Sequence, residues 1–298
     1  MGLNSETFQK LIVNGGGSWR EPFQILTTLL LSLLLPLSFL LLSRISAAHY
    51  LASILLPDNS EPSTFLAFLF LYSSNSTIFL YALVSLVSVA AFVHAFTGDK
   101  TTTFLSRRQQ PVFRPRLYAA WILLCTLQVC VGLGIEGSID AGINGSAVGL
   151  SRREMRSSLF STRLIFFFVG LHETTRFWSK SVVKPVVDDT VTGFVKEERW
   201  IERVGMALCF GTLWWWGLRD EVDSLAVVAE LKKEALLSVG VADFLGWCLY
   251  YLTVSIGITR VFKGAIWVGT VLLFRIKVER DLNDSVSPDR TTIVEDKV

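Results

Sequence analysis

The stretch FQILTTLLLSLLLPLSFLLLS, residues 23–43, decides the fold class, because none of its 21 residues is charged. An α-helix rises about 1.5 Å per residue, so roughly 20 apolar residues cross the hydrocarbon core of a bilayer. A cleaved signal peptide has an apolar stretch of only about 7–15 residues. We therefore expect residues 23–43 to remain in the protein as a signal anchor. We also expect a kink, because Pro36 leaves the carbonyl of Ser32 without its helical donor.

Five further apolar blocks along the 298 residues indicate that the chain crosses the bilayer repeatedly. The composition is 51 % hydrophobic and 18 % charged, whereas an average soluble domain carries about 25 % charged residues. This composition excludes a disordered protein and a nucleic-acid binder with a basic surface. The sequence predicts an all-α, polytopic membrane helix bundle with six spans. They are residues 23–43, 77–96, 117–135, 159–178, 204–218 and 239–258, of which the fourth and fifth are the weakest candidates.

One short apolar segment, Gly264–Phe274, leaves two alternatives for the number of spans, six or seven. It has 11 residues between Lys263 and Arg275, which is too short for an independent span. It is expected to be a re-entrant or interfacial piece or a cytosolic extension of the sixth helix; if it crosses, there are seven spans. We expect three regions: a cytosolic tail at 1–22, a transmembrane domain at 23–276 and a disordered tail at 277–298.

The basic residues predict how the chain is threaded. With six spans and a cytosolic N-terminus, 20 of the 28 Lys and Arg residues lie on the cytosolic side, 7 lie on the outer side, and Arg163 lies within the fourth span. Short cytosolic loops are enriched in Lys and Arg. We therefore expect both termini in the cytosol. The signal anchor predicts a membrane of the secretory pathway, either the endoplasmic reticulum or the plasma membrane.

The fourth span carries the most informative polar residues, His172, Glu173 and Arg176. The three fall within one arc of about 100° on a helix. Ionisable groups at membrane depth usually mark a functional site, so these residues form a possible polar membrane site. The alternative is that a tilted helix places them in the cytosolic headgroup layer. The sequence HETTR departs from the zinc-binding pattern HExxH, because Arg176 stands where the second histidine is required. We therefore expect no metal and no cofactor here.

Two loops carry further candidate sites. The basic loop before the third span is a possible contact for anionic lipid headgroups, although its charges also serve simply as the orientation signal. These residues are Arg107, Arg108, Arg114 and Arg116. On the predicted outer side, Asn144 begins an Asn-Gly-Ser sequon and is a possible glycosylation site.

Several other local patterns receive structural interpretations. The glycines of 132–137 spell GxGxxG at the end of an apolar block rather than after a strand, so a dinucleotide site is not expected. We expect them to permit close helix packing or helix termination. Asp188 and Asp189 predict a solvated turn. Residues 219–238 are predicted to be helical, with acids at the start and Lys232 and Lys233 near the end.

Tryptophans near the predicted span ends are expected to form an aromatic belt at the membrane interface. These are Trp19, Trp178, Trp200 and Trp214–Trp216.

Three stretches resemble an uncharacterised family of multi-pass membrane proteins from land plants. They are Val129–Gly137, Val183–Thr190 and Trp214–Trp216. The resemblance implies a membrane protein with several spans and implies no activity and no catalytic residue.

Three functions are compatible with the sequence. A non-enzymatic scaffold or regulator is favoured, because the middle of the spans is nearly free of ionisable groups. A transporter or channel would use a polar path at His172, Glu173 and Arg176, with Gln128 of the third span as a further polar residue. An intramembrane enzyme would use the same three residues. The expected partners are the lipid bilayer and other transmembrane helices, including those of an oligomer, and not nucleic acid.

Overall fold

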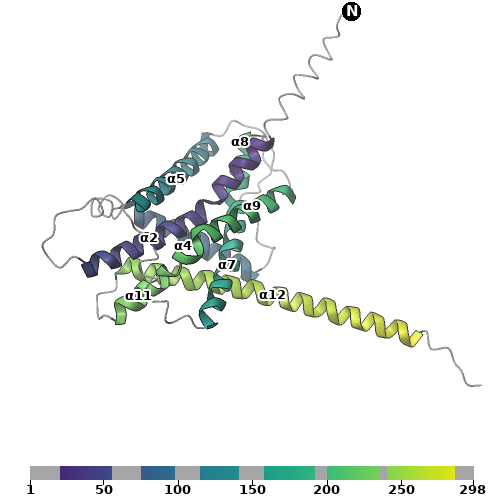
Figure 1. Ribbon diagram of the computed structural model, residues 1–298. Coiled ribbons are helices and arrows are strands. Elements are labelled where there is room, and N and C mark those ends of the chain that lie inside the picture. Colours follow the sequence, from purple (N-terminus) through teal and green to yellow (C-terminus); the bar gives the residue numbers. More distant parts are fainter. Residues whose placement is uncertain are drawn as a thin grey trace, which may run out of the picture.

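The computed structural model describes residues 21–55, 75–97, 115–140, 158–191, 200–234 and 240–285. Within these ranges the regular structure is entirely helical (Figure 1). Four helices are long and apolar enough to cross a membrane: Glu21–Leu51, Thr77–Thr97, Leu117–Asp140 and Val241–Arg280. The predicted spans 159–178 and 204–218 lie in helices outside this group. The first of these two helices carries Arg163, Glu173 and Arg176, which lower its hydropathy.

The first long helix is interrupted close to Pro36, as the sequence predicts. Residues 21–32 are helical, Leu33 is a turn residue, and α2 (Leu34–Leu55) follows. Pro36 has no amide hydrogen and cannot continue the helical ladder at Ser32. The ladder resumes where the amide of Leu37 donates to the carbonyl of Leu33 at 3.1 Å.

The remaining elements form further long helical segments and one short helix. They are α4 (Asn75–Thr97), α5 (Pro115–Asp140), α7 (Ser158–Trp178), the π-helix η3 (Ser179–Val183), α8 (Lys184–Val191), α9 (Trp200–Leu213), the π-helix η4 (Trp214–Leu218), α10 (Arg219–Glu221), α11 (Ser224–Glu234) and α12 (Val241–Ser285). The segment α7–η3–α8 is one uninterrupted helix, and so is α9–η4–α10. Pro185 lies just after η3, where its missing donor and its ring disturb the preceding turn, so the helix widens there.

The contacts between α2 and its neighbours define their relative directions. On α7–η3–α8, the Trp178 indole contacts the Leu31 carbonyl, and Asp188 contacts Gln24, so this helix runs antiparallel to α2. On α9–η4–α10, Gly205 lies against Leu29, so this helix starts beside the start of the first helix. It ends at Glu221 beside Arg44, so it runs parallel to α2.

The contacts of α12 place α4 and α7 in the same direction as α12. Gly246 lies beside Tyr81 of α4, and Lys263 reaches the end of α4. On α7, the carbonyl of Phe166 lies against Gly257, and Glu173 pairs with Arg260. Successive long helices of the described chain therefore alternate in direction wherever two contacts fix it.

The crossing of α7 and α12 brings two helix backbones into direct contact. A Cβ at Gly170 would overlap the carbonyl of Thr253 and lie 3.0 Å from the amide nitrogen of Gly257. A Cβ at Gly257 would overlap the carbonyl of Phe166 in the same way. Thr174, one turn after Gly170, is fully buried, as is Thr253. Small residues four apart on both helices thus form the seam, as in close-packed membrane helices.

The C-terminal half of α12 extends away from the rest of the described structure as a single helix (Figure 1). Residues 264–274 are therefore an extension of the sixth predicted helix and do not turn back. The prediction that the tail is disordered from residue 277 is wrong for residues 277–285, because α12 continues to Ser285. Arg, Lys and Glu between 275 and 280 are good helix formers, so the helix continues at little cost.

Some local predictions also need correction. Asp188 is not in a solvated turn: it is 1 % exposed and lies in α8. Gly132 does not mediate close packing, because nothing lies within 4 Å of a Cβ added there, and α5 does not end at these glycines. Residues 219–238 are predicted correctly as helical where the structure describes them, in α10 and α11.

The tryptophans of the expected aromatic belt differ in exposure. Trp200, Trp215 and Trp216 are 65–78 % exposed. Trp178, in contrast, is buried and donates to the carbonyl of Leu31, since α7 continues into η3 rather than ending at an interface.

The Gly170–Gly257 contact makes a first prediction. Replacing Gly170 or Gly257 with alanine forces the two backbones apart, which we expect to lower the unfolding free energy by about 2 kcal/mol or more. The measurement is the thermal unfolding midpoint of the purified protein in detergent. Gly264→Ala, at an open position of α12, is the matched control and should leave the midpoint unchanged or raise it. Equal midpoints for all three variants would contradict the assigned crossing.

Candidate functional site

A buried cluster of charged and polar side chains around Arg44 joins three helices. The Arg44 guanidinium binds the Glu221 carboxylate at two points, Nε to Oε2 at 2.5 Å and Nη2 to Oε1 at 2.7 Å. Its Nη1 donates to Ser138 Oγ at 2.9 Å. Arg44 is 4 % exposed and Glu221 is 8 % exposed. A two-point charge-assisted contact is strong and directional, so it fixes α2, α5 and α10 relative to one another.

A second buried ion pair closes the hairpin of α11 and α12. Lys232 Nζ lies 2.7 Å from Asp243 Oδ2, and the amide of Gly240 donates to the same oxygen at 3.1 Å. Asp243, the third residue of α12, therefore also satisfies the amide of the residue before the helix, as the N3 side chain of a capping box does. At the other end of α11, Ser224 Oγ donates to the carbonyl of Ser43 at 2.9 Å. The helix α11 is thus held to α12 at one end and to α2 at the other.

A third group of polar contacts lies at the start of the first helix. The Gln24 side-chain amide donates to Asp188 of α8. Lys184, also on α8, pairs with Glu202 of α9 at 2.7 Å, and both side chains are largely buried. The first helix, α8 and α9 are consequently joined by polar contacts at this end.

The residues predicted as a polar membrane site lie close together, and the structure adds Arg260 to them. Glu173 pairs with Arg260 of α12 at 3.4 Å, with 17 % of the Glu173 side chain exposed. His172 points toward another helix and meets the ring of Phe210 edge-on at 5.4 Å. Arg176 and Arg260 are near enough to His172 to interact with it electrostatically. Sequence reasoning did not identify Arg260, because it lies 84 residues after Arg176 on another helix.

A single lysine caps α4 from the side of α12. Lys263 Nζ donates to the carbonyls of Ala95 and Phe96, the second at 3.1 Å. These carbonyls belong to the last turn of α4, where no further helical donors are available. A cation at a helix C-terminus is also favoured by the helix dipole. Lys263 therefore fixes α12 against the end of α4.

Between these groups, the centre of the bundle is filled by aromatic rings. Phe167 of α7 is fully buried, stacks on Tyr250 of α12 at 4.9 Å and meets Phe39 of α2 edge-on at 5.9 Å. Phe168 packs against Phe210 at 5.3 Å. The aromatic layer comprises Phe39, Phe167, Phe168, Phe210, Trp214 and Tyr250. It leaves Trp214 stacked inside the bundle, unlike the exposed Trp215 and Trp216.

Few polar groups in this part of the bundle lack a hydrogen-bond partner. Within the described residues, buried atoms without a partner are Ser88 Oγ, Trp121 Nε1 and Gln128 Oε1. Gln128 and Trp121 lie two turns apart on α5. Across the same described residues, no group of three His, Cys, Asp or Glu side chains could hold a metal ion.

The remaining predicted site residues fall largely outside the described ranges. Arg107, Arg108, Arg114 and the sequon residue Asn144 lie outside them. Arg116 is the second residue of α5. The lipid contact and the glycosylation site therefore stay predictions.

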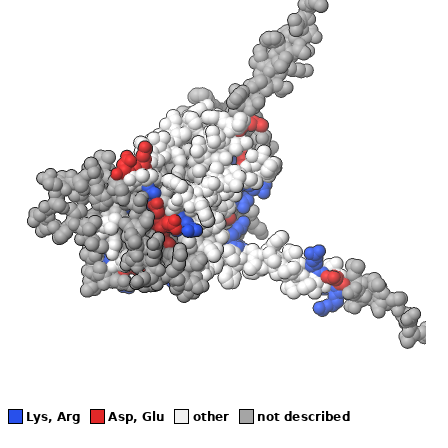
Figure 2. All heavy atoms as spheres, viewed as in Figure 1, with Lys and Arg blue, Asp and Glu red and all other residues white. Residues whose placement is uncertain are grey.

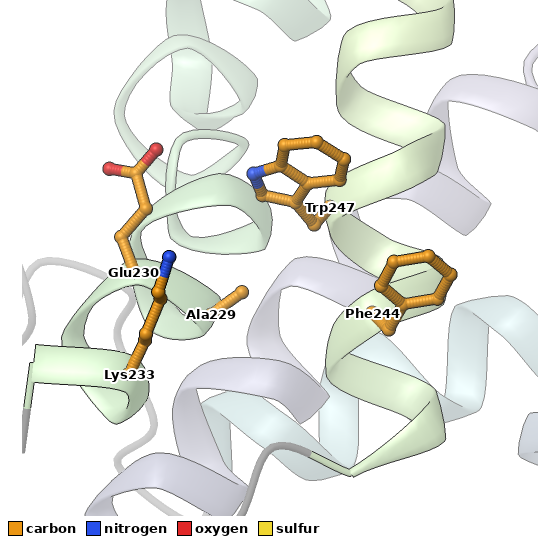
Figure 3. A pocket seen from close by; sticks show the side chains of 5 residues that line it. All are labelled: Ala229, Glu230, Lys233, Phe244 and Trp247. Atoms are coloured by element: carbon orange, nitrogen blue, oxygen red, sulfur yellow. The ribbon is translucent and has the colours of Figure 1, made fainter. Parts of the chain in front are cut away.

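A shallow depression of about 340 Å³ lies between α11 and α12 (Figure 3). Glu230 and Lys233 extend from α11 on one side of it, and Phe244 and Trp247 from α12 on the other. Ala229 lies between them, where its small side chain leaves the space open.

Comparison with known proteins gives no relative: no protein family, curated protein or solved structure matches the chain.

The Arg44 cluster makes the second prediction. Arg44→Met leaves the buried Glu221 carboxylate unpaired, which we expect to destabilise the protein by about 3–5 kcal/mol. The double variant Arg44→Met with Glu221→Met removes both charges and should recover most of this loss. Denaturant unfolding of the purified protein in detergent measures both values.

The control for this experiment is Arg219→Met. Arg219 pairs with Asp220 at 3.4 Å, but both side chains are well exposed, so its loss should cost about 0–1 kcal/mol. A double variant that is no more stable than Arg44→Met would show that the two charges do not act as a pair.

Proposed function

We propose that this chain is an integral membrane protein that crosses the bilayer six times, with both termini in the cytosol, and that it acts as a non-enzymatic scaffold. The observation that supports the six crossings is the spacing of the polar contacts along three helices. Gln24 and Arg44 on the first helix are about 20 residues apart, or about 30 Å. Glu202 and Glu221 on α9–η4–α10 have nearly the same separation, as do Asp243 and Lys263 on α12.

This separation equals the thickness of a hydrocarbon core, about 30 Å. The separation of Glu202 and Glu221 shows that α9–η4–α10 is also long enough to cross, although its sequence is a weak candidate for a span. In Figure 2 the upper part of the face in view is largely uncharged, whereas charged side chains gather at its borders, in a mixed group lower on this face and on the far end of α12.

The partners in each contact support the same threading. Arg44, Ser138 and Glu221 all lie at the predicted outer ends of spans, and so do Lys232 and Asp243. At the predicted cytosolic ends, Lys184 meets Glu202, and Lys263 meets the end of α4. Contacts that join residues distant in sequence thus link ends that the basic residues assign to the same side.

The scaffold function is supported by how the middle of the bundle is filled. A transport path must bring polar groups and water through this region, whereas the stacked rings of Phe39, Phe167 and Tyr250 occupy it. The charges at the two ends are used to hold helices together, as in the pair of Arg44 with Glu221. Such an arrangement favours a fixed shape over a changing one.

One observation favours the alternative, a transporter or channel. Trp178 contacts Leu31, about seven residues further along the first helix than Gln24. Glu173, five residues before Trp178, therefore lies deeper in the bundle than the Gln24 contact. Ionisable groups at such depth often line a substrate pathway. The pairing of Glu173 with Arg260 is the competing structural explanation.

The threading makes the third prediction. In a variant whose four cysteines are replaced by alanine, single cysteines are introduced as Asp220→Cys or Lys277→Cys, both on exposed side chains. With sealed vesicles whose cytosolic face is outward, a membrane-impermeant maleimide should label Lys277→Cys directly and Asp220→Cys only after detergent is added. If residues 264–274 crossed as a seventh span, both positions would lie on the outer side and would be labelled only after detergent is added. Labelling of both positions from the same side would therefore contradict six crossings.

The scaffold function makes the fourth prediction. Proteoliposomes with the wild-type protein should carry Na⁺, K⁺, Cl⁻ and H⁺ no faster than empty liposomes, because the aromatic layer leaves no polar path. Flux is measured with ion-sensitive dyes enclosed in the vesicles. A flux above the empty control that Glu173→Gln abolishes, and that Glu279→Gln at the exposed end of α12 leaves intact, would overturn the scaffold in favour of transport.

A further inference from the structure

We propose that the depression between α11 and α12 binds the headgroup of a phosphatidylcholine, a phospholipid with a phosphate and a quaternary ammonium group. This inference rests on the membrane-spanning arrangement proposed above, because it places the depression at the outer end of α12. Its volume of about 340 Å³ is at the lower end of the range of small-molecule sites, about 300–1,000 Å³.

The location suits a lipid headgroup rather than a soluble ligand. Phe244 and Trp247 occupy the first turns of α12, close to Asp243, whose ion pair with Lys232 marks the outer end of this helix. Phe244 and Ile258 are 57 % and 37 % exposed and share one face of α12, so apolar surface continues from the depression along the helix. A bound lipid would therefore place its headgroup against α11 and its chains along α12.

The charges of the depression match a zwitterion. Glu230 and Lys233 are exposed and lie three residues apart, so they share a face of α11 (Figure 3). Lys233 offers donors for a phosphate, whereas the neighbouring Lys232 is held by Asp243. The Glu230 carboxylate attracts a positive charge and would repel a second anion. A headgroup that carries only a negative charge fits this pair less well than one that carries both charges.

The aromatic side chains determine which positive group fits. Trp247 is 37 % exposed, stacks with Phe244 at 6.3 Å and lies 4.7 Å from the ring of Tyr251. The Tyr251 hydroxyl donates to Glu230 at 3.4 Å, which joins the aromatic group to the carboxylate. Ring faces, with tryptophan the best of them, attract quaternary ammonium groups, which have no N–H to donate. The combination of Trp247 and Glu230 therefore selects choline.

The test is native mass spectrometry of the full-length protein in detergent with equal amounts of phosphatidylcholine, phosphatidylethanolamine and phosphatidylglycerol. The wild type should retain one phosphatidylcholine in preference to the other two lipids. Trp247→Leu should reduce this preference by about fivefold, the effect of one cation–π contact. Lys233→Gln should reduce the retention of phosphatidylcholine by a similar factor, because Lys233 would contact the phosphate that all three lipids share. Trp267→Leu and Lys277→Gln, at exposed positions elsewhere on α12, are the controls and should retain the wild-type behaviour.

Three outcomes would overturn the proposal: equal retention of the three lipids by the wild type, an unchanged preference in Trp247→Leu together with unchanged retention in Lys233→Gln, or an equal loss in the controls. Free phosphocholine forms a separate arm; if it displaces the bound lipid at millimolar concentration, the headgroup alone is recognised. Extraction of the protein from membranes by alkaline carbonate tests the membrane arrangement by itself. A protein that resists carbonate but shows no lipid preference would refute only the headgroup site.

Discussion

The direct backbone contact between Gly170 and Gly257 is the constraint on which the rest of the described structure depends. In the proposed membrane arrangement, helices gain little from burying apolar side chains, because the surrounding lipid is equally apolar. Close approach at small residues gains dispersion contacts that larger residues would prevent. Because α7 and α12 touch here, Phe167 can stack on Tyr250 and Glu173 can reach Arg260.

The ion pairs then fix the helices lengthwise, which small residues alone do not do. A buried ion pair adds little stability when compared with apolar residues, because both charges lose their hydration. A misaligned pair, however, leaves a charge buried without a partner. The contacts of Arg44 with Glu221 and of Lys232 with Asp243 therefore disfavour any sliding of α2, α10 or α12 along its axis. Their value lies in specifying one arrangement rather than in stabilising it strongly.

Much of the helical content could be predicted from the sequence, because the length and charge of apolar blocks determine it. The block at 23–43 and the interruption near Pro36 follow from hydropathy and the missing proline donor. The structure extends the predicted helices where polar residues continue a helix, as at Asp188 and beyond residue 277. There the polar side chains signal a loop, whereas packing against the first helix or high helix propensity overrides that signal.

The contacts between helices could not be predicted, since each depends on which helices are neighbours. Gly170 and Thr174 are spaced four apart, as are Thr253 and Gly257, and either pair alone is common in any apolar helix. Arg44 follows the predicted outer end of the first span, and Glu221, near the predicted outer end of the fifth span, carries the complementary charge. Pairing opposite charges between span ends on one side is the signal that sequence reasoning could have used.

The same contacts bear on the choice between a scaffold and a transporter. Alternating access requires one group of helices to rock against another about a polar site near the middle of the membrane. Here α12 is fixed to α7 at Gly257, to α4 through Lys263 and to α11 through Asp243. A rocking motion of α12 would have to break the contacts of Asp243 and Lys263 and separate two touching backbones. The pairing of Glu173 with Arg260 joins α7 to α12, as the proposed scaffold would require.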